Sequence, residues 1–186
     1  MIKIRLLPTA IAIAFSLLSV PPIAAKSIDQ DPLLKSVDLV RERLIVRGIW
    51  AYQAGYYTEA VTLLRDFLSD RRIIATLLEK QGLIYLALAY QRVGESNQAT
   101  KTIERGINLA HNSPLELAQL EDAAGSIAQE QNQLQRASIH WEKARQLYLA
   151  CNQRQQWTEV TLKLAHNYRR LQKNRKYQEL LAELSS

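Results

Sequence analysis

The sequence predicts an all-α fold, an αα-hairpin solenoid of about four repeats and eight helices. Three observations predict it: turn residues recur at regular intervals, small residues recur at fixed offsets from those turns, and no stretch alternates polar and apolar residues as a strand would. Composition agrees, because 47% apolar and 23% charged residues are ordinary for a globular domain and exclude a wholly disordered chain. The 186 residues suit one domain, or two at most.

Residues 1–25 have the pattern of a secretory signal peptide. Two basic residues, Lys3 and Arg5, precede an apolar run over residues 6–20, and the segment ends in the small residues of PPIAA. The run is about 15 residues long, whereas a membrane-spanning helix needs roughly 20. We therefore expect an exported protein, periplasmic or secreted, whose repeat domain occupies residues 26–186. The alternative is an uncleaved segment that anchors the protein in a membrane.

Charge and cysteine content narrow the class of protein. Cleavage after residue 25 would lower the formal net charge from +6 to +4, because Lys3 and Arg5 are lost and no acidic residue is. A mildly basic chain is weak support for an anionic partner. The single Cys151 can form neither an internal disulfide nor a cysteine-based zinc site, and its apolar neighbours predict a buried, inert thiol.

Helix boundaries follow from prolines and turn residues. Pro32 and Pro114 each follow a good capping residue, and proline is tolerated in a first helical turn, so both should begin helices. Thr58 and Ser96 are expected to cap two further helices. Tight turns within helix pairs are predicted at residues 54–57, 93–95, 131–132 and 172–174. Longer joints between pairs are predicted near Asp70, near Asn112–Ser113 and near Cys151–Asn152, which gives four antiparallel pairs with helices of roughly 11 to 24 residues.

The helix pairs repeat along the chain. Small residues recur in the second helix of the pairs, five residues after a turn residue, at Ala60, Ala99 and Ala137. A second set lies twelve residues upstream and continues into the fourth pair, at Gly48, Ala87, Gly125 and Ala165. Small side chains are needed where two helices cross closely. The spacings of 38 to 40 residues are typical of a helical solenoid.

The segment over residues 83–106 carries these features most fully. It has, in order, a small residue, an aromatic residue, a turn glycine and a second small residue: Ala87, Tyr90, Gly94 and Ala99. In this it resembles the tetratricopeptide repeat (TPR) family, and weaker copies extend the resemblance over roughly residues 41–180. The period departs from the family's usual value of about 34 residues. That predicts joints longer by one helical turn, as in the long repeats of kinesin light chains and of arrays that precede CHAT-type domains.

No pattern of catalytic or cofactor-binding residues stands out. The histidines His111, His140 and His166 have no carboxylate or second histidine at a metal-ligand spacing. His111 should end a helix and His140 should be surface or half-buried packing, whereas His166 is a candidate contact for a partner. Adjacent carboxylates such as Glu121 and Asp122 are interpreted as ordinary helix surface. We therefore expect no enzyme, no cofactor and no metal ion.

Aromatic residues mostly occupy positions that hairpin packing would bury. Those interpreted as core are Trp50, Tyr90, Trp141, Tyr148 and Tyr168. A cluster of cations near the C-terminus consists of Arg169, Arg170, Lys173, Arg175 and Lys176. It is either a solvated helix end or a patch for an acidic protein segment or an anionic membrane surface. Nucleic acid is disfavoured, since the protein is expected to be exported and no aromatic residues are interleaved with these cations for stacking.

The TPR resemblance implies that the first helices of successive pairs line a concave groove. In this sequence the lining would consist of Ile45, Ile49, Tyr52, Tyr85, Leu88, Arg92, Asp122, Ser126, Gln129, Lys163, His166 and Arg170. The groove would make the protein a non-catalytic scaffold that binds an extended or helical segment of another protein, with Tyr52 and Tyr85 as anchors and Arg92 and Arg170 reading charge. The family's carboxylate-clamp pattern is not found in the sequence, so capture of a free C-terminus is not expected.

Two other functions remain open. One is self-assembly, for instance as a homodimer, through the apolar stripe of the last helix, which consists of Tyr177, Leu180, Leu181 and Leu184. The same stripe also suits a helix that covers the end of the stack. The other function is that of a regulatory array for a separately encoded catalytic protein.

Overall fold

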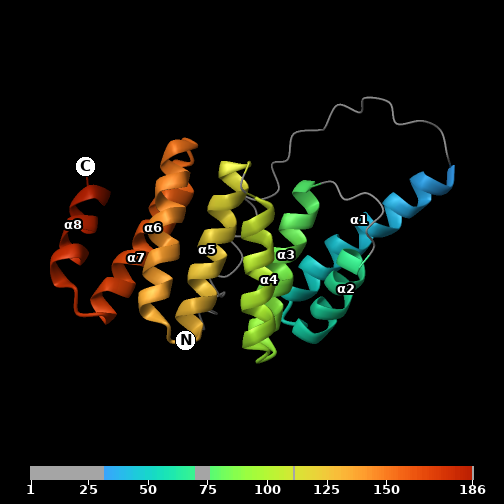
Figure 1. Cartoon of the computed structure of the whole chain (residues 1–186), viewed down its shortest axis with the longest axis horizontal. Coiled ribbons are helices and arrows are strands. Elements are labelled where there is room, and N and C mark those ends of the chain that lie inside the picture. The colour runs from blue at the N-terminus through green and yellow to red at the C-terminus, as the bar shows by residue number, and fades with distance from the viewer. Residues whose placement is uncertain (1–31, 70–75, 111, 186) are drawn as a thin grey trace, which may run out of the picture. The chain divides into compact units, whose positions relative to one another are not determined.

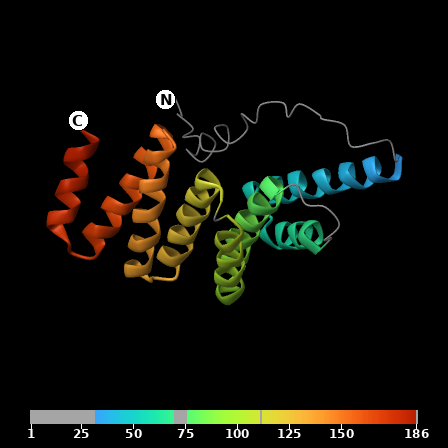
Figure 2. The same ribbon diagram turned by 45° about the horizontal axis from the view of Figure 1, so that its top comes forward.

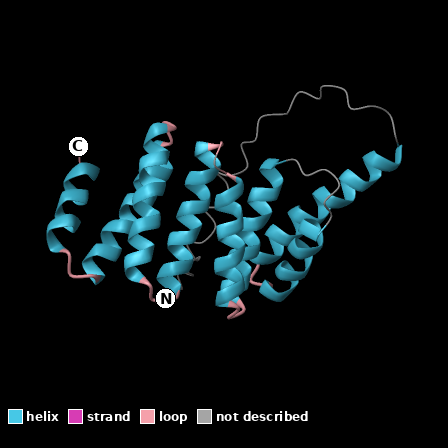
Figure 3. Ribbon diagram, viewed as in Figure 1, coloured by secondary structure: helices cyan, strands magenta, loops and turns pink. Residues whose placement is uncertain are grey.

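The computed structural model describes residues 32–69, 76–110 and 112–185, and over these ranges the chain is helical without any strand (Figure 3). The helices are α1 (Pro32–Gln53), α2 (Tyr57–Ser69), α3 (Thr76–Arg92), α4 (Ser96–Leu109), α5 (Pro114–Glu130), α6 (Leu134–Ala150), α7 (Arg154–Arg170) and α8 (Asn174–Leu184). Pro32 and Pro114 begin helices as predicted. The signal peptide expected at residues 1–25, the joint near Asp70 and the position of His111 lie outside the described residues.

The helices pair and stack in chain order. Residues 36–186 form one compact unit. Within it α3 packs on α4, α5 on α6 and α7 on α8, and each pair also packs on the next through α2 and α3, α4 and α5, and α6 and α7 (Figures 1 and 2). Helix α3 additionally contacts α5, so the first helix of one pair lies against the first helix of the next. The chain is therefore an αα-hairpin solenoid, which confirms the predicted fold class.

Five of the turns have the same backbone geometry. In each, one residue adopts a positive φ between two helices, and these residues are Gly55, Gly94, Asn132, Asn152 and Gln172. The next residue donates its N–H to a carbonyl five residues back, as Gln133 does to Ala128 at 2.8 Å and Gln153 does to Tyr148 at 2.9 Å. This is the Schellman arrangement, in which a left-handed residue lets the chain leave a helix while its last carbonyls stay bonded.

The predicted long joint near Cys151–Asn152 is wrong. It is a three-residue turn of the same kind as the turns inside the hairpins. Helices α5, α6 and α7 each have 17 residues, so in this half of the chain the extra length of the repeat lies in the helices and not in the joints. The tight turn was not predicted from the sequence because it depends on a left-handed conformation of Asn152. Asparagine tolerates this conformation, but its presence does not by itself indicate it.

The expected side-chain caps are also wrong. Thr58 and Ser96 lie inside the first turns of α2 and α4, because the residue after each left-handed glycine already occupies the position before the helix. At α4 that position is Glu95, whose side chain makes no capping hydrogen bond. Ser113 precedes Pro114 as expected, but its hydroxyl receives a hydrogen bond from Lys80 Nζ at 3.4 Å and does not cap α5.

The turns allow a direct test of backbone strain. A residue other than glycine in the left-handed region costs about 1 kcal/mol, so Gln172→Gly is expected to raise the free energy of unfolding by roughly 0.5–1 kcal/mol. Gly94→Gln, with φ at 86° in the same turn geometry, should lower it by a similar amount. Urea unfolding followed by circular dichroism measures both. Equal stabilities of Gln172→Gly and the natural protein would contradict the assignment of strain to this turn.

The small residues lie where helices cross, as predicted. A Cβ at Gly48 would be 2.7 Å from Leu64 Cγ, and one at Gly125 would be 2.6 Å from Trp141 Nε1. Ala87 and Ala165 are buried at the corresponding positions of the other pairs. Distances under 3.0 Å mean that even a methyl group would push the partner side chain away.

The aromatic predictions hold with one exception. Tyr90, Trp141, Tyr148 and Tyr168 are buried, but Trp50 is 60% exposed. Its ring lies beside that of Tyr56, with centroids 6.1 Å apart. Trp50 is therefore not a core residue.

Helix α8 packs on α7. Leu180 is buried against α7, and Tyr177 is half-buried in the same cluster. Leu181 and Leu184 are half-buried as well, and Arg145 of α6 forms an ion pair with Glu183 of α8. The apolar stripe of α8 is thus buried within the chain in part, with Leu180 fully enclosed and the other three side chains half-buried. No described helix combines the length and the apolar character needed to cross a membrane.

Candidate partner-binding face

The first helices of the four pairs are joined side by side through their side chains. Tyr52 of α1 meets Tyr85 of α3 edge to face, with ring centroids 5.6 Å apart. An ion pair of 3.2 Å joins Arg92 at the end of α3 to the last residue of α5, Glu130. Lys163 of α7 donates to both carboxylate oxygens of Asp122 on α5 at 2.8 Å. We call the continuous surface of α1, α3, α5 and α7 the first-helix face.

A cluster of tyrosines occupies the N-terminal part of this face. Tyr52 lies between Tyr57 and Tyr85, at 5.6 Å from the centroid of each. Burial raises the pKa of Tyr52 and of Tyr85, although hydrogen bonds from Arg92 and Gln53, respectively, act in the opposite direction. The hydrogen bond to Tyr52 in turn raises the pKa of Arg92. At neutral pH the face therefore presents uncharged phenols beside a charged guanidinium.

Most of the predicted lining residues are accessible on this face. Ile49, Tyr52, Tyr85, Leu88, Asp122, Ser126, Gln129 and Lys163 are half-buried, and Arg92, His166 and Arg170 are exposed. Ile45 is the exception, because it is only 2% exposed and belongs to the core. It precedes Gly48 by three residues, so it lies on the side of α1 that packs against Leu64 of α2. Ile45 is a packing residue and not a lining residue.

The two adjacent carboxylates of α5 were wrongly interpreted as ordinary helix surface. Glu121 is buried, with its Oε2 at 2.6 Å from His140 Nδ1 and its Oε1 at 3.5 Å from Lys143 Nζ. Asp122 accepts hydrogen bonds from Lys163 and, at 2.9 Å, from the indole Nε1 of Trp141. These carboxylates fix α6 and α7 to α5, so they are structural elements of the face.

Ion pairs between repeats account for much of the charge on the face. Lys163 is neutralised by Asp122 and Arg92 is held by Glu130. These partners are 41 and 38 residues apart in the sequence, close to one repeat period. Opposite charges one period apart are thus a signal that could have revealed these pairs from the sequence.

The C-terminal end of the face keeps free positive charge. Within the described chain Arg169 and Arg170 form no ion pair, and Arg170 only donates to the side-chain oxygen of Asn132 at 3.3 Å. The other members of the predicted cluster lie beyond α7: Lys176 contacts Glu142 and Tyr168, Arg175 pairs with Glu179, and Lys173 stands 5.8 Å over the ring of Tyr168. The five cations are therefore divided between the end of α7, the turn after it and the first part of α8.

The structure also places the candidate metal ligands and the single cysteine. No three histidine, cysteine, aspartate or glutamate side chains come together as metal ligands anywhere in the described ranges. Cys151 is half-buried in the turn after α6, less enclosed than the sequence indicated.

The fold is similar to that of several solved structures. No family model matches the chain. No curated protein matches it. Among solved structures it is similar to BtubC (BKLC) from P. vanneervenii, with a TM-score of 0.65 and 18% identity over 77% of this chain and 60% of that one. It is also similar to the Rap conjugation gene regulator of the plasmid pLS20 in complex with the Phr* peptide, with a TM-score of 0.65 and 13% identity over 97% of this chain and 54% of that one.

The chain has a TPR-like helical-repeat fold. It spans between half and two thirds of the length of these two relatives. At such low identity the similarity concerns the fold alone.

Proposed function

We propose that the protein is a non-catalytic scaffold that binds a segment of another protein along the first-helix face. The observation that carries this proposal is the face itself: four helices joined side by side, with phenols at one end and free arginines at the other. The Rap regulator, which shares the fold, was solved with a peptide bound, and this supports a peptide-like ligand here.

The charges on the face define the kind of segment that fits. Because Arg92 and Lys163 already have carboxylate partners, they have less charge to offer a ligand than the sequence indicated. His166, Arg169 and Arg170 at the end of α7 are exposed. We therefore propose a segment with an apolar or aromatic side chain that packs on Tyr85 and Leu88, and an acidic side chain that pairs with Arg170.

Site-specific crosslinking identifies the partner and locates its site. A photo-crosslinking amino acid at Leu88 should capture one protein from an extract of the source organism, and the same group at exposed Ile139 on α6 should not. The captured segment is then synthesised and titrated calorimetrically. Tyr85→Ala and Arg170→Glu should each weaken its binding by roughly tenfold, the usual effect of truncating an interface anchor or reversing a paired charge.

Arg136→Glu is the matched control, since it makes the same charge change on an exposed residue of the second helix α6. Its dissociation constant should equal that of the natural protein. Capture with equal yield from Ile139, or an unchanged affinity in both Tyr85→Ala and Arg170→Glu, would show that the first-helix face is not the binding site.

Export is a separate part of the proposal. It rests on the basic start, apolar middle and small-residue end of residues 1–25. An exported scaffold would meet its partner outside the cytoplasm. N-terminal sequencing of the protein from its own cells, with cleavage expected after Ala25, tests this part without reference to binding.

A further inference from the structure

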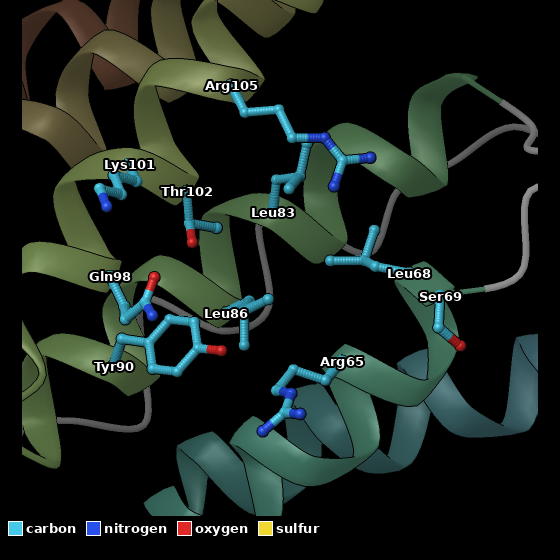
Figure 4. Close-up of a pocket in the computed structure, with 10 residues that line it drawn as sticks. All are labelled: Arg65, Leu68, Ser69, Leu83, Leu86, Tyr90, Gln98, Lys101, Thr102 and Arg105. Atoms are coloured by element: carbon cyan, nitrogen blue, oxygen red, sulfur yellow. The ribbon is translucent and has the colours of Figure 1, made fainter.

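A pocket lies between α2, α3 and α4, outside the first-helix face. Its volume is about 340 Å³. Figure 4 shows Arg65 of α2 pointing towards Tyr90 and Leu86 of α3, with Thr102 and Lys101 of α4 on the opposite side of the hollow. It shares no lining residue with the face described above. Volumes from about 300 Å³ upward are typical of sites for small molecules.

The rim of this pocket carries an excess of positive charge. Arg65, Lys101 and Arg105 line it, and none of the 10 residues labelled in Figure 4 is acidic. Arg105 is held by Glu79 at 2.8 Å. Arg65 and Lys101 have neither a hydrogen bond nor an ion pair with any residue that the structure describes. Two cations of separate helices therefore line one hollow on opposite sides, and neither has a counter-charge among the described residues.

The interior of the pocket offers both apolar surface and hydroxyl groups. Leu86 and the ring of Tyr90 form part of its wall, and the Tyr90 hydroxyl is directed into the hollow (Figure 4). Neither Tyr90 nor Thr102 uses its hydroxyl in a hydrogen bond within the described ranges. An anion bound by the two cations could accept hydrogen bonds from these two hydroxyl groups. An apolar group attached to the anion could pack against Leu86.

The next repeat provides an internal comparison. The corresponding hollow between α4, α5 and α6 has a volume of only about 20 Å³. Glu104, which stands one repeat after Arg65, lines it and forms an ion pair of 3.6 Å with Arg136. That hollow is closed and its rim is neutral. The stacking of hairpins does not by itself create an open, cationic hollow, because the next repeat lacks one. These features belong to the pocket at Arg65.

We propose that this pocket binds a small organic anion. The anionic group, a carboxylate or a phosphate, lies between Arg65 and Lys101 and accepts hydrogen bonds from the hydroxyls of Tyr90 and Thr102. The apolar part of the ligand packs on Leu86 and the Tyr90 ring. Because this site and the first-helix face have no residue in common, a partner segment and the anion can bind at the same time.

Nuclear magnetic resonance titrations of the whole protein test this proposal with four probes. Octyl phosphate and octanoate carry the two candidate anions on an apolar chain, 1-octanol has the chain without charge, and inorganic phosphate has the charge without the chain. We expect saturable shifts at amides of Leu86 and Thr102 with at least one octyl anion, and weaker binding of the two partial probes. The stronger of the two octyl anions identifies the anionic group.

Charge reversal then locates the site. Arg65→Glu and Lys101→Glu should each weaken binding of the better octyl anion by roughly tenfold, as expected when a charge-assisted contact is lost. Arg136→Glu, in the neighbouring hollow, should leave it unchanged. Both target residues are exposed, and thermal melts of the variants confirm folding. Arg65→Lys, which keeps the charge, should bind better than Arg65→Glu.

Three results would overturn the proposal. They are no saturable binding of either octyl anion, equal binding of 1-octanol, and affinities that neither reversal changes. Because no part of the test uses the first-helix face, its failure is distinguishable from a failure of the scaffold proposal.

Discussion

Replacement of Trp141 by alanine is expected to lower the free energy of unfolding by about 3–5 kcal/mol. The indole is 1% exposed and lies against Gly125 at the crossing of α5 and α6. It also donates to Asp122, which in turn holds Lys163 of α7. The substitution opens a cavity and loosens the carboxylate that joins three helices. Urea unfolding measures the loss.

The effect of replacing Gly125 by alanine on stability is expected to change sign when Trp141 is removed. In the natural protein Gly125→Ala should cost about 1–3 kcal/mol, because the new methyl group would lie 2.6 Å from Trp141 Nε1. In a Trp141→Leu background the colliding indole atoms are gone, and the same change should stabilise by about 0.5–1 kcal/mol through the higher helix propensity of alanine. Ser126→Ala, the next residue, is the control and should have a small effect. A cost for Gly125→Ala that is equal in both backgrounds would show that the indole does not set the helix distance.

The second large effect is expected at the ion pair that joins α3 to α5. Lys80 is 6% exposed and forms an ion pair with Glu116 of α5. Glu116→Leu leaves the ammonium group buried without its partner and should cost about 3–5 kcal/mol. Adding Lys80→Met removes the buried charge as well, so the double variant should recover most of this loss.

The same helix supplies the control for that pair. Glu79 of α3 pairs with Arg105, which is largely exposed, so Glu79→Leu should cost less than about 1 kcal/mol. Urea denaturation midpoints of the four proteins are compared at one salt concentration. If Glu116→Leu and Glu79→Leu lowered the free energy of unfolding by the same small amount, the prediction would be wrong. Lys80 would then have to become solvated when Glu116 is removed.

The local parts of the fold could be predicted from the sequence. Some residue types are required by backbone geometry and therefore predict a local structure directly. These are the turn glycine Gly94, Pro114 in the first turn of a helix, and Gly125 where two helices cross. Asn152 marks its turn less clearly, because asparagine is also common outside the left-handed region. For that reason the joint between α6 and α7 was predicted at the right place but expected to be longer than it is.

The candidate site was less predictable, because its chemistry depends on residues far apart in the chain. Whether Ile45 or Ile49 faces outward depends on how α1 is rotated against α2, which the spacing of apolar residues alone does not fix. The burial of Glu121 depends on His140 and Lys143 of another helix. The charge of each hollow between hairpins also depends on separate helices, since Arg65 and Lys101 line one without an acidic residue, whereas Glu104 pairs with Arg136 in the next.

The uniform spacing from α5 onward restricts how this protein can change in length. Helices α5, α6, α7 and α8 begin at residues 114, 134, 154 and 174, and identical turns join them. Loss or gain of one such 20-residue unit would leave every turn intact yet move each later helix to the opposite side of the array. Insertions and deletions that preserve the first-helix face must therefore come in whole pairs of helices, so natural variants of this chain should differ by multiples of two units.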